Sequence, residues 1–476
     1  MSGLGGPLSI SGKGKGGGAA VKTTGSAGAA WVDAHPREND AAITKRPPRA
    51  RRTVCATTGC ILTANFRLRY AFDIERPSAW LKPFGTCPRP KTVPVCPVVM
   101  TLAEQLAALE PAFLRELHRY GFDPGRLEHW ARTMGGGDER NRVKGKVSPP
   151  EPGDISPLPD ADSAEGKKLA ARGMEALSRG ELGFVVLAGG MATRMGGLVK
   201  ALVEAAEGQS FLDLRLAEQA HWATICGVTP PLWLMTSHAT EAPIRSALGP
   251  RLENESIATF PQFVSLRLTE EGSLFFDGRG EPSVYATGHG DLPDALAKSA
   301  LLSSFLQEHG DKTLWIANLD NLGASIDPLV LGFHLESGAE LTVEVVEKVG
   351  SDRGGIPVRY EGRPIVLEEL RLPKSFDPSS VRVFNTNTFL VNARALARLA
   401  MDFTFLEVAK TVEGRVAIQH ERLIGEMTTA FRTSFLKVPR DGLRSRFLPV
   451  KDAAELRARR DHIREVAIAR GMLRPC

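Results

Sequence analysis

Four short apolar runs limit the possible folds of this chain more than any other part of its sequence. They are FVVLA (184–188), PLWLMTS (231–237), TLWIANL (313–319) and LTVEVV (341–346). Continuous apolar runs of this length are typical of strands that are buried on both faces of a sheet. Helical stretches, notably 211–226 and 292–307, follow several of them. The alternation predicts an α/β fold with a mostly parallel, Rossmann-like sheet and helices on both faces.

The segments outside this alternation differ from it in composition. Residues 1–99 show little hydrophobic periodicity and contain Gly-rich tracts and the basic run KRPPRARR. Thr101 and Glu104 form a capping-box pattern just after Met100. We expect a disordered leader or mis-assigned start over 1–99, a helical segment over 100–146, a Pro- and Asp-rich linker over 147–163, the main domain over 164–457 and a charged C-terminal helix over 458–476.

Charge and cysteine content exclude several classes of protein. The net charge is +5, but the first 100 residues hold 15 Lys and Arg against 5 Asp and Glu, so the remainder is mildly acidic. A nucleic-acid binder should carry its basic residues on the folded surface, so we expect no nucleic-acid partner. No apolar run approaches the roughly 20 residues of a membrane span. Of the 6 cysteines, 4 lie in the leader at spacings unlike those of zinc knuckles. These features predict a cytoplasmic protein with no membrane partner.

A glycine loop follows the first apolar run. In FVVLAGGMATRMGGLVKAL (184–202), a buried strand leads into Gly189, Gly190, Arg194 and Lys200. Glycines at the carboxyl end of a strand let backbone N–H groups approach phosphate oxygens, and the two cations can neutralise them. The alternative is a Gly-rich turn that carries two solvated cations. The sequence has neither GxxxxGK[ST] nor GxGxxG here, which excludes a P-loop and a dinucleotide-binding loop.

The loop resembles the signature of sugar-phosphate nucleotidyltransferases, and equally that of molybdenum-cofactor guanylyltransferases. Further motifs distinguish them: TGHGD (287–291), NLDNLGASID (318–327), RGG (353–355), FNTN (384–387) and VPRDGLRSRFLPVKDAAEL (438–456). Together they resemble the UDP-glucose pyrophosphorylase family over about 181–457. The resemblance implies a GT-A-like fold and a reaction in which UTP and glucose 1-phosphate form UDP-glucose and pyrophosphate.

The chain departs from the family pattern at several positions. Val199 replaces the usual proline, Arg353 replaces a lysine, and extra residues interrupt the PRSRF element. Arg194 is more typical of UDP-N-acetylhexosamine pyrophosphorylases, which leaves the sugar open. The sequence ends soon after FLPVK, so we expect no C-terminal β-helix domain and a monomer or weak oligomer. The motifs also leave open an enzyme that uses a different nucleotide and a silent relative that only binds nucleotide sugars.

The resemblance implies catalytic roles for four side chains and a metal. Lys200, Arg194 and Lys451 would contact phosphates, and His289 would donate to the sugar phosphate or the α-phosphate. Asp320 would bind Mg²⁺, which is typically held by one or two carboxylates together with phosphates. The structural alternatives are a turn-capping aspartate, surface lysines and a packed histidine.

Further residues are expected to bind the substrates. The nucleotide-binding set comprises Leu187, Ala188, Gly189, Gly190, Gln262, Gly288 and Asn318. Gly288 resembles the family's backbone contact to uracil, and the Gln262 amide has the donor and acceptor needed for a base edge.

The asparagines of two motifs complete the predicted site. Asn318 belongs to the nucleotide site by resemblance, while Asn321 is interpreted as a turn residue. Period-2 alternation places Asn385 and Asn387 on one face of a short strand, where their amides suit sugar hydroxyls. A structural role as strand-edge amides is the alternative for this pair.

Overall fold

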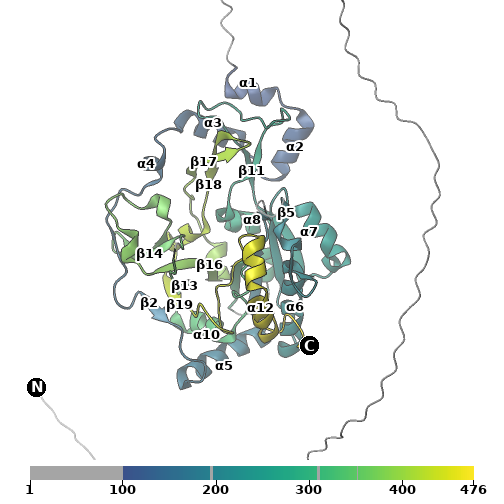
Figure 1. The fold of residues 1–476 in the computed structure, drawn as a ribbon, viewed down its shortest axis with the longest axis vertical. Helices are drawn as coiled ribbons and strands as arrows, with labels where there is room; N and C mark the ends of the chain where they lie inside the picture. The colour runs from purple at the N-terminus through teal and green to yellow at the C-terminus, as the bar shows by residue number, and fades with distance from the viewer. Residues whose placement is uncertain (1–99, 193–196, 308–310, 351, 476) are drawn as a thin grey trace, which may run out of the picture. The chain divides into compact units, whose positions relative to one another are not determined.

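The computed structural model describes residues 100–192, 197–307, 311–350 and 352–475 (Figure 1). Its largest sheet has eight strands in the order β2-β19-β13-β16-β12-β3-β8-β9. The strands are β2 Ile155–Pro157, β19 Thr433–Lys437, β13 Leu341–Glu347, β16 Val383–Asn392, β12 Thr313–Asn318, β3 Leu182–Leu187, β8 Leu232–Thr236 and β9 Ile257–Pro261. All neighbouring pairs are parallel except the two that include β16. The predicted mostly parallel α/β sheet is therefore confirmed, and each of the four apolar runs forms one of its strands.

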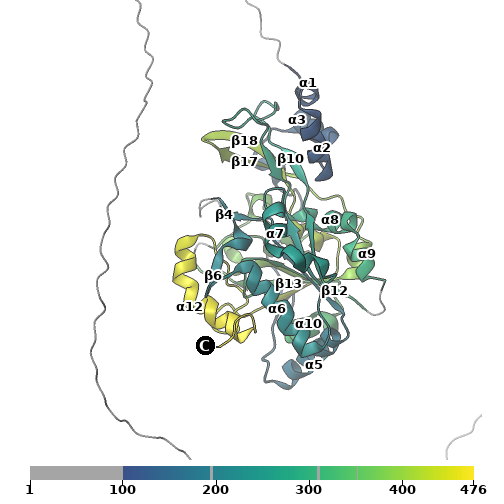
Figure 2. The ribbon, with the colours of Figure 1, turned by 90° about the vertical axis from the view of Figure 1, so that its right-hand side faces the viewer.

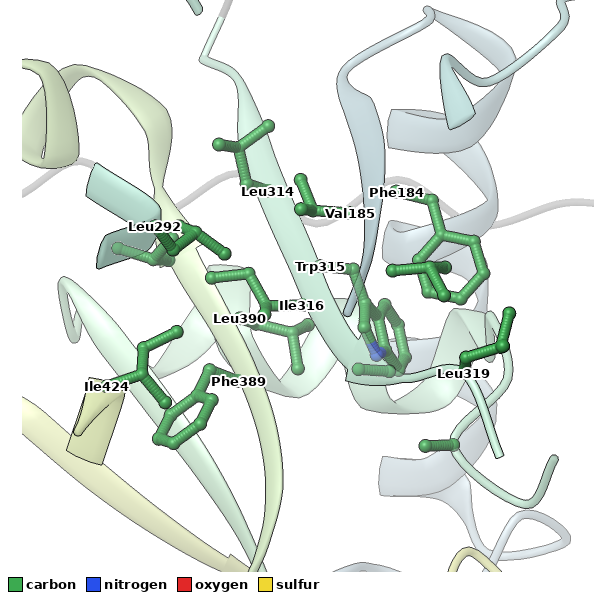
Figure 3. Packing of buried hydrophobic residues seen from close by; sticks show 14 of the residues in the cluster. Phe184, Val185, Leu292, Leu314, Trp315, Ile316, Leu319, Phe389, Leu390 and Ile424 are labelled. Atoms are coloured by element: carbon green, nitrogen blue, oxygen red, sulfur yellow. The ribbon is translucent and has the colours of Figure 1, made fainter. Parts of the chain in front are cut away.

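The central strands are buried on both faces, as their continuous apolar sequences require. Phe184 of β3 and Trp315 and Ile316 of β12 are almost fully inaccessible to solvent. Figure 3 shows Trp315 on one side of β12 and Ile316 on the other. The register pairs Asn318 with Leu187. The loops that follow β3 and β12 therefore leave the sheet side by side at its carboxyl edge.

The helices that flank the sheet contact one another in groups. α5 (Ala164–Ser178) contacts both α6 (Phe211–Cys226) and α10 (Pro328–Ser337), while α11 (Ala393–Ala397) contacts α8 (Leu292–Ser299) and α9 (Leu301–Phe305). α6 has the predicted bounds. The stretch predicted as a helix over 292–307 is instead divided at Ala300, whose φ is +61°. α5 and α10 cross with their backbones in contact, because a Cβ at Gly173 would lie 1.9 Å from the carbonyl oxygen of Pro328.

The N-terminal helices pack on a second, smaller core. α1 (Leu102–Ala107) begins with the predicted capping box, and α2 (Pro111–Arg119) has a proline in its first turn. α3 (Pro124–Thr133) and α4 (Asp138–Asn141) follow. This core also includes side chains of β10 (Val264–Leu266) and β11 (Val284–Ala286), near the hairpin of β17 (Leu406–Val412) and β18 (Arg415–Glu421). Figures 1 and 2 show these elements together at one end of the described chain.

Two segment boundaries differ from those predicted. Within 147–163, β1 (Val147–Ser148) pairs with β14 (Ile356–Tyr360), which pairs in turn with β15 (Arg363–Leu367), and β2 joins the main sheet beside β19. The prediction of a linker there was wrong at these positions, because strands this short show no alternation along the sequence. The C-terminal helix, α12 (Ala453–Ala469), begins five residues before the predicted boundary because the Asp452 side chain caps it.

No helix among the described residues is long and apolar enough to cross a bilayer.

Candidate active site

A cleft of about 420 Å³ lies where β3, β8 and β12 end. Open α/β sheets bind ligands at this edge. Ten of the residues predicted for the site line it: Leu187, Ala188, Gly189, Gly190, Lys200, Gln262, Gly288, His289, Asn318 and Asp320. Met235 and Leu319 complete the lining. Residues from five separate stretches of the chain thus meet around one cavity.

The two glycines of the loop after β3 have different surroundings. A Cβ at Gly189 would lie 2.9 Å from Nε2 of Gln262, whereas a Cβ at Gly190 would meet nothing within 4 Å. The Gln262 backbone is fixed by its N–H, which donates to the Thr236 carbonyl at 2.8 Å. Gly189 therefore leaves room for the Gln262 side chain, whereas the backbone of Gly190 is open to the cleft.

Lys200 reaches the cleft from the far side of this loop. It begins a short 3₁₀ helix, η2 (Lys200–Leu202), directly after β5 (Leu198–Val199), which pairs with β4 (Met191–Ala192). Its Nζ lies 2.6 Å from Oδ2 of Asp320, and both side chains are largely buried. The predicted cation and the predicted metal ligand thus neutralise each other. Arg194 lies outside the described residues.

Asp320 fits a metal that is shared with phosphates. Within the described ranges, no group of three or more His, Cys, Asp or Glu side chains is arranged to hold a metal ion. Among the described residues that line the cleft, Asp320 is the single carboxylate. Mg²⁺ is commonly bound through one or two carboxylates and completes its coordination with phosphate oxygens and water. The donor set therefore suits Mg²⁺ bound with a nucleotide and not a site made of protein ligands alone.

His289 is held as a neutral donor. The Ile424 N–H donates to its Nδ1 at 3.0 Å, so the ring proton of the neutral imidazole resides on Nε2. Burial lowers the pKa of His289 to about 4, which keeps the ring uncharged at neutral pH. Gly288 allows this packing, because its φ is +105° and a Cβ would lie 2.5 Å from the Arg422 carbonyl oxygen.

Asp291 supports both the His289 loop and the Gln262 segment. Its Oδ2 accepts from the Phe263 N–H at 2.8 Å and from the Thr287 hydroxyl at 2.7 Å, and its Oδ1 accepts from Arg422. The carboxyl is fully buried, and burial raises its pKa against the opposing effect of Arg422. Sequence reasoning missed Asp291 although it ends the TGHGD motif, because two of its three partners, Phe263 and Arg422, lie in other segments.

The FNTN asparagines do not lie on one face of a regular strand. Asn387 has φ +60°, a left-handed conformation that asparagine tolerates better than most residues. The pairing of β16 with β13 shifts between Val343 and Val345, so the predicted alternation was wrong here. Asn387 instead donates from its amide to Oδ1 of Asn318 at 2.8 Å, and its N–H donates to Oδ1 of Asn385 at 2.8 Å. The two asparagines therefore adjoin the cleft through Asn318.

The FLPVK segment is connected to the Asp320 turn through Asn321. The Asn321 amide donates to the Arg446 carbonyl at 3.2 Å and its Oδ1 accepts from the Leu448 N–H at 2.7 Å. This contact agrees with the interpretation of Asn321 as a turn residue. Lys451 is exposed and is not among the residues that line the cleft. Its backbone N–H donates to Glu455.

Glu368 is a partly buried acidic residue that the sequence did not indicate. Burial and the neighbouring Glu369 raise the pKa of Glu368 to about 7. A Cβ at Gly355 would lie 2.6 Å from its Oε1, and the Gly355 carbonyl accepts from the Asn385 N–H at 2.8 Å. Glu368 thus lies next to the RGG motif and Asn385. The pair of glutamates after β15 looks like an exposed turn in the sequence.

Comparison with known proteins gives consistent matches. The family model described as UTP--glucose-1-phosphate uridylyltransferase matches residues 140–468. A protein of that name from Hordeum vulgare is 32% identical over 288 residues, which cover 57% of this chain and 59% of the relative. One from Pyrus pyrifolia is 32% identical over 320 residues, covering 63% and 64%. The chain thus spans about six tenths of the length of these relatives.

Solved structures support the fold. A UDP-glucose phosphorylase from Trypanosoma brucei aligns with a TM-score of 0.58 at 23% identity, covering 72% of this chain and 76% of that one. A UDP-glucose pyrophosphorylase mutant from Leishmania major, solved in complex with UDP-glucose, aligns with a TM-score of 0.56 at 22% identity, covering 75% and 77%. At these identities the likeness establishes a shared fold.

Proposed function

Because the chain belongs to the UTP--glucose-1-phosphate uridylyltransferase family, we propose that it transfers a uridylyl group from UTP to glucose 1-phosphate, forming UDP-glucose and pyrophosphate. One observation carries the proposal beyond the family match. The glycine loop, Lys200, His289 and Asp320 line a single cleft at the carboxyl edge of the sheet. A phosphate-rich substrate and a metal are the ligands that this combination of groups suits.

The nucleotide would bind across the loop after β3. The Gln262 amide offers a donor and an acceptor to the uracil edge, and the Gly288 backbone also lines the cleft. The open backbone at Gly190 leaves room for phosphate oxygens to approach. The sugar would extend toward Asn387 and Asn385, whose amides suit hydroxyl groups.

The reaction requires charge stabilisation and no covalent enzyme intermediate. An oxygen of the sugar phosphate would attack the α-phosphorus of UTP in line, and pyrophosphate would leave. Neutral His289 would donate from Nε2 to a phosphate oxygen, a role that needs no proton transfer. Bound Mg²⁺ would gather phosphate oxygens that otherwise repel one another.

Lys200 and Asp320 would change partners when the substrates bind. Their direct contact of 2.6 Å occupies the ammonium and one carboxylate oxygen. With nucleotide and metal present, Lys200 would contact a phosphate and Asp320 the metal. Each charge would remain neutralised throughout, so neither group would have to be left unpaired inside the cleft.

A pyrophosphate-release assay tests the proposal. Several nucleoside triphosphates are combined with glucose 1-phosphate or N-acetylglucosamine 1-phosphate, with and without Mg²⁺. We expect the highest kcat/KM for UTP with glucose 1-phosphate and little activity without Mg²⁺. The folded variant Lys200→Met serves as the control for contaminating activity.

A second arm separates the competing functions. Higher kcat/KM with N-acetylglucosamine 1-phosphate would assign the chain to UDP-N-acetylhexosamine chemistry, and higher kcat/KM with another triphosphate would overturn the choice of UTP. UDP-glucose binding without turnover under any combination would indicate a silent relative.

A further inference from the structure

The turn that carries Asp320 has no regular structure of its own. It runs from the end of β12 at Asn318 to the start of α10 at Pro328. Part of the turn is fixed by backbone hydrogen bonds, such as that from the Ala324 N–H to the Asn321 carbonyl at 3.0 Å. Next to Asp320 the backbone bonds are the longer ones from the Leu319 N–H to the Leu187 carbonyl at 3.2 Å and from the Asn321 N–H to the Asn318 carbonyl at 3.3 Å, so side chains that bind this backbone add to its definition.

A buried arginine of α6 binds the turn on both sides of Asp320. Nη2 of Arg215 donates to the Asn321 carbonyl at 2.6 Å and to the Asn318 carbonyl at 3.3 Å. Its Nη1 donates to the Ala324 carbonyl at 3.3 Å. One planar guanidinium thus holds three carbonyls of a single turn, two of which flank the proposed metal ligand.

Glu218 completes this contact one turn later on α6. Its Oε2 accepts from Nη1 of Arg215 at 2.7 Å, and its Oε1 accepts from the Ile326 N–H at 2.7 Å. Both side chains are 0% exposed. The ion pair therefore binds the backbone of the turn from Asn318 to Ile326, through both carbonyl and N–H groups.

Stability alone does not account for this pair. Removing two charges from water is costly, and apolar residues of similar size often give equal or greater stability at such positions. What apolar residues cannot supply is directional hydrogen bonding to backbone groups. We propose that Arg215 is a positioning residue that fixes Asp320 for the transfer reaction; its effect on rate rests on the proposed function, and its effect on the turn does not.

The turn has a second side-chain attachment at Ser325, so the effects of the two attachments can be measured separately. Arg446 donates to the Ser325 carbonyl at 2.9 Å and pairs with Glu344 of β13 at 2.7 Å. Arg446 makes no contact with the carbonyls of Asn318 or Asn321 among the described hydrogen bonds. Loss of Arg215 should therefore loosen the Asp320 end of the turn, which keeps its bonds from the Asn321 side chain to Arg446 and Leu448, more than the Ser325 end, which the Arg446 side chain still holds.

The experiment compares three variants with the parent enzyme. The double variant Arg215→Met with Glu218→Met removes both buried charges together, so that neither is left unpaired. Arg215→Lys keeps the charge but loses the planar fork that spans several carbonyls. The control is Arg359→Met, which removes the two-bonded pair of Arg359 with Asp154, 2.7 Å apart, in β14 and away from the cleft lining.

Two measurements are made on each folded variant. Hydrogen exchange of peptides over 318–326 reports the turn without any substrate. Steady-state kinetics give kcat and KM for both substrates. The same changes are also made in an Asp320→Asn background, because a residue that acts through Asp320 should cause no further loss once that carboxylate is removed.

We expect faster exchange over 318–326 and a fall in kcat on the order of 10²-fold, as small misplacements of catalytic groups produce. KM should change less than kcat, and the control should show neither effect. Parental exchange and kcat in the double variant, or full additivity with Asp320→Asn, would overturn the proposal. If the double variant does not fold, Arg215→Lys decides by the same criteria. If the parent has no activity, the proposed function fails, and exchange over 318–326 still decides whether Arg215 holds the turn.

Discussion

Adding one methyl group at Gly189 should alter recognition of the base. Neither Gly189 nor Gly190 has a positive φ, so alanine is compatible with the backbone at both positions. The new Cβ at position 189 would lie 2.9 Å from Nε2 and 3.3 Å from Cδ of Gln262. Ordinary contact requires 3.4–4 Å, so the amide must retreat by about half an ångström to one ångström. The Gln262 backbone is fixed by its bond to Thr236, so the side chain has to move.

The cost follows from the hydrogen bonds that this shift breaks. A bond of ordinary length that is stretched by this amount falls outside the range of useful geometry. Each net hydrogen bond contributes about 0.5–1.5 kcal/mol, and the amide is proposed to make two with uracil. The loss of roughly 1–3 kcal/mol corresponds to a fall in kcat/KM for UTP of about 5- to 150-fold.

The assay measures kcat/KM for UTP, CTP and ATP in Gly189→Ala, Gly190→Ala and Gln262→Ala. Gly189→Ala should lose preference for UTP and behave like Gln262→Ala. Gly190→Ala should keep the preference and lower the rate with all three nucleotides, because its Cβ enters the space proposed for phosphates. Thermal unfolding should change little in either glycine variant.

Two results would refute this reasoning. Unchanged nucleotide preference in Gly189→Ala, with the protein folded, would mean that Gln262 does not contact the base. Full activity in Gly190→Ala would mean that phosphates do not pass over the glycine loop.

Further predictions concern charge and pH. Lys200→Ala should lower kcat on the order of 10²-fold, as loss of a preorganised donor does elsewhere. Asp320→Asn should raise the Mg²⁺ concentration needed for half-maximal rate. Parental kinetics in both variants would show that neither residue takes part in catalysis. Lys451→Ala should also lower kcat, because Lys451 is predicted to contact the phosphates. A parental kcat/KM would exclude Lys451 from phosphate binding. The pKa of Glu368 is raised to about 7 in the folded protein, so the stability that its protonated form contributes should be lost as pH rises from about 4.5 to 7. The denaturation midpoint of Glu368→Gln should therefore fall less over this range than that of the parent. Because the pKa of His289 is lowered to about 4, the parent should lose stability as pH falls from 6.5 toward 4, and His289→Gln should lose less; parallel curves would contradict the buried neutral ring.

The sequence predicted those parts of the fold that are encoded locally. The apolar runs of β3, β8, β12 and β13 and the helix α6 were placed from hydrophobic patterning alone. β2 was missed because a three-residue edge strand is recognisable only beside β19, which lies almost 300 residues later in the chain. Asn387 was misplaced because a left-handed residue and a register shift both interrupt alternation.

The candidate site was predictable to the extent that it follows from topology. Loops after neighbouring parallel strands must meet at one edge, so the glycine loop and Asp320 could be expected together. The supporting residues could not be expected in the same way. Arg215 looks like an ordinary helix residue, and its partner carbonyls lie more than 100 positions later. Glu368 likewise becomes distinctive only once Gly355 is packed against it.

α12 connects the segment that bears Lys451 with a hairpin more than 240 residues earlier in the chain. Asp452 begins a helix of 17 residues directly after Lys451. Two turns and more along it, Arg460 and Arg464 reach Glu204 and Glu207 in the β6–β7 hairpin (Glu204–Ala206 and Gln209–Ser210), which follows the Lys200 helix (Figure 2). From its first residue to Arg464 the helix rises by about 18 Å, which separates the segment that bears Lys451 from the hairpin that follows Lys200. The helix therefore provides a direct connection between these two segments that does not include any strand of the main sheet.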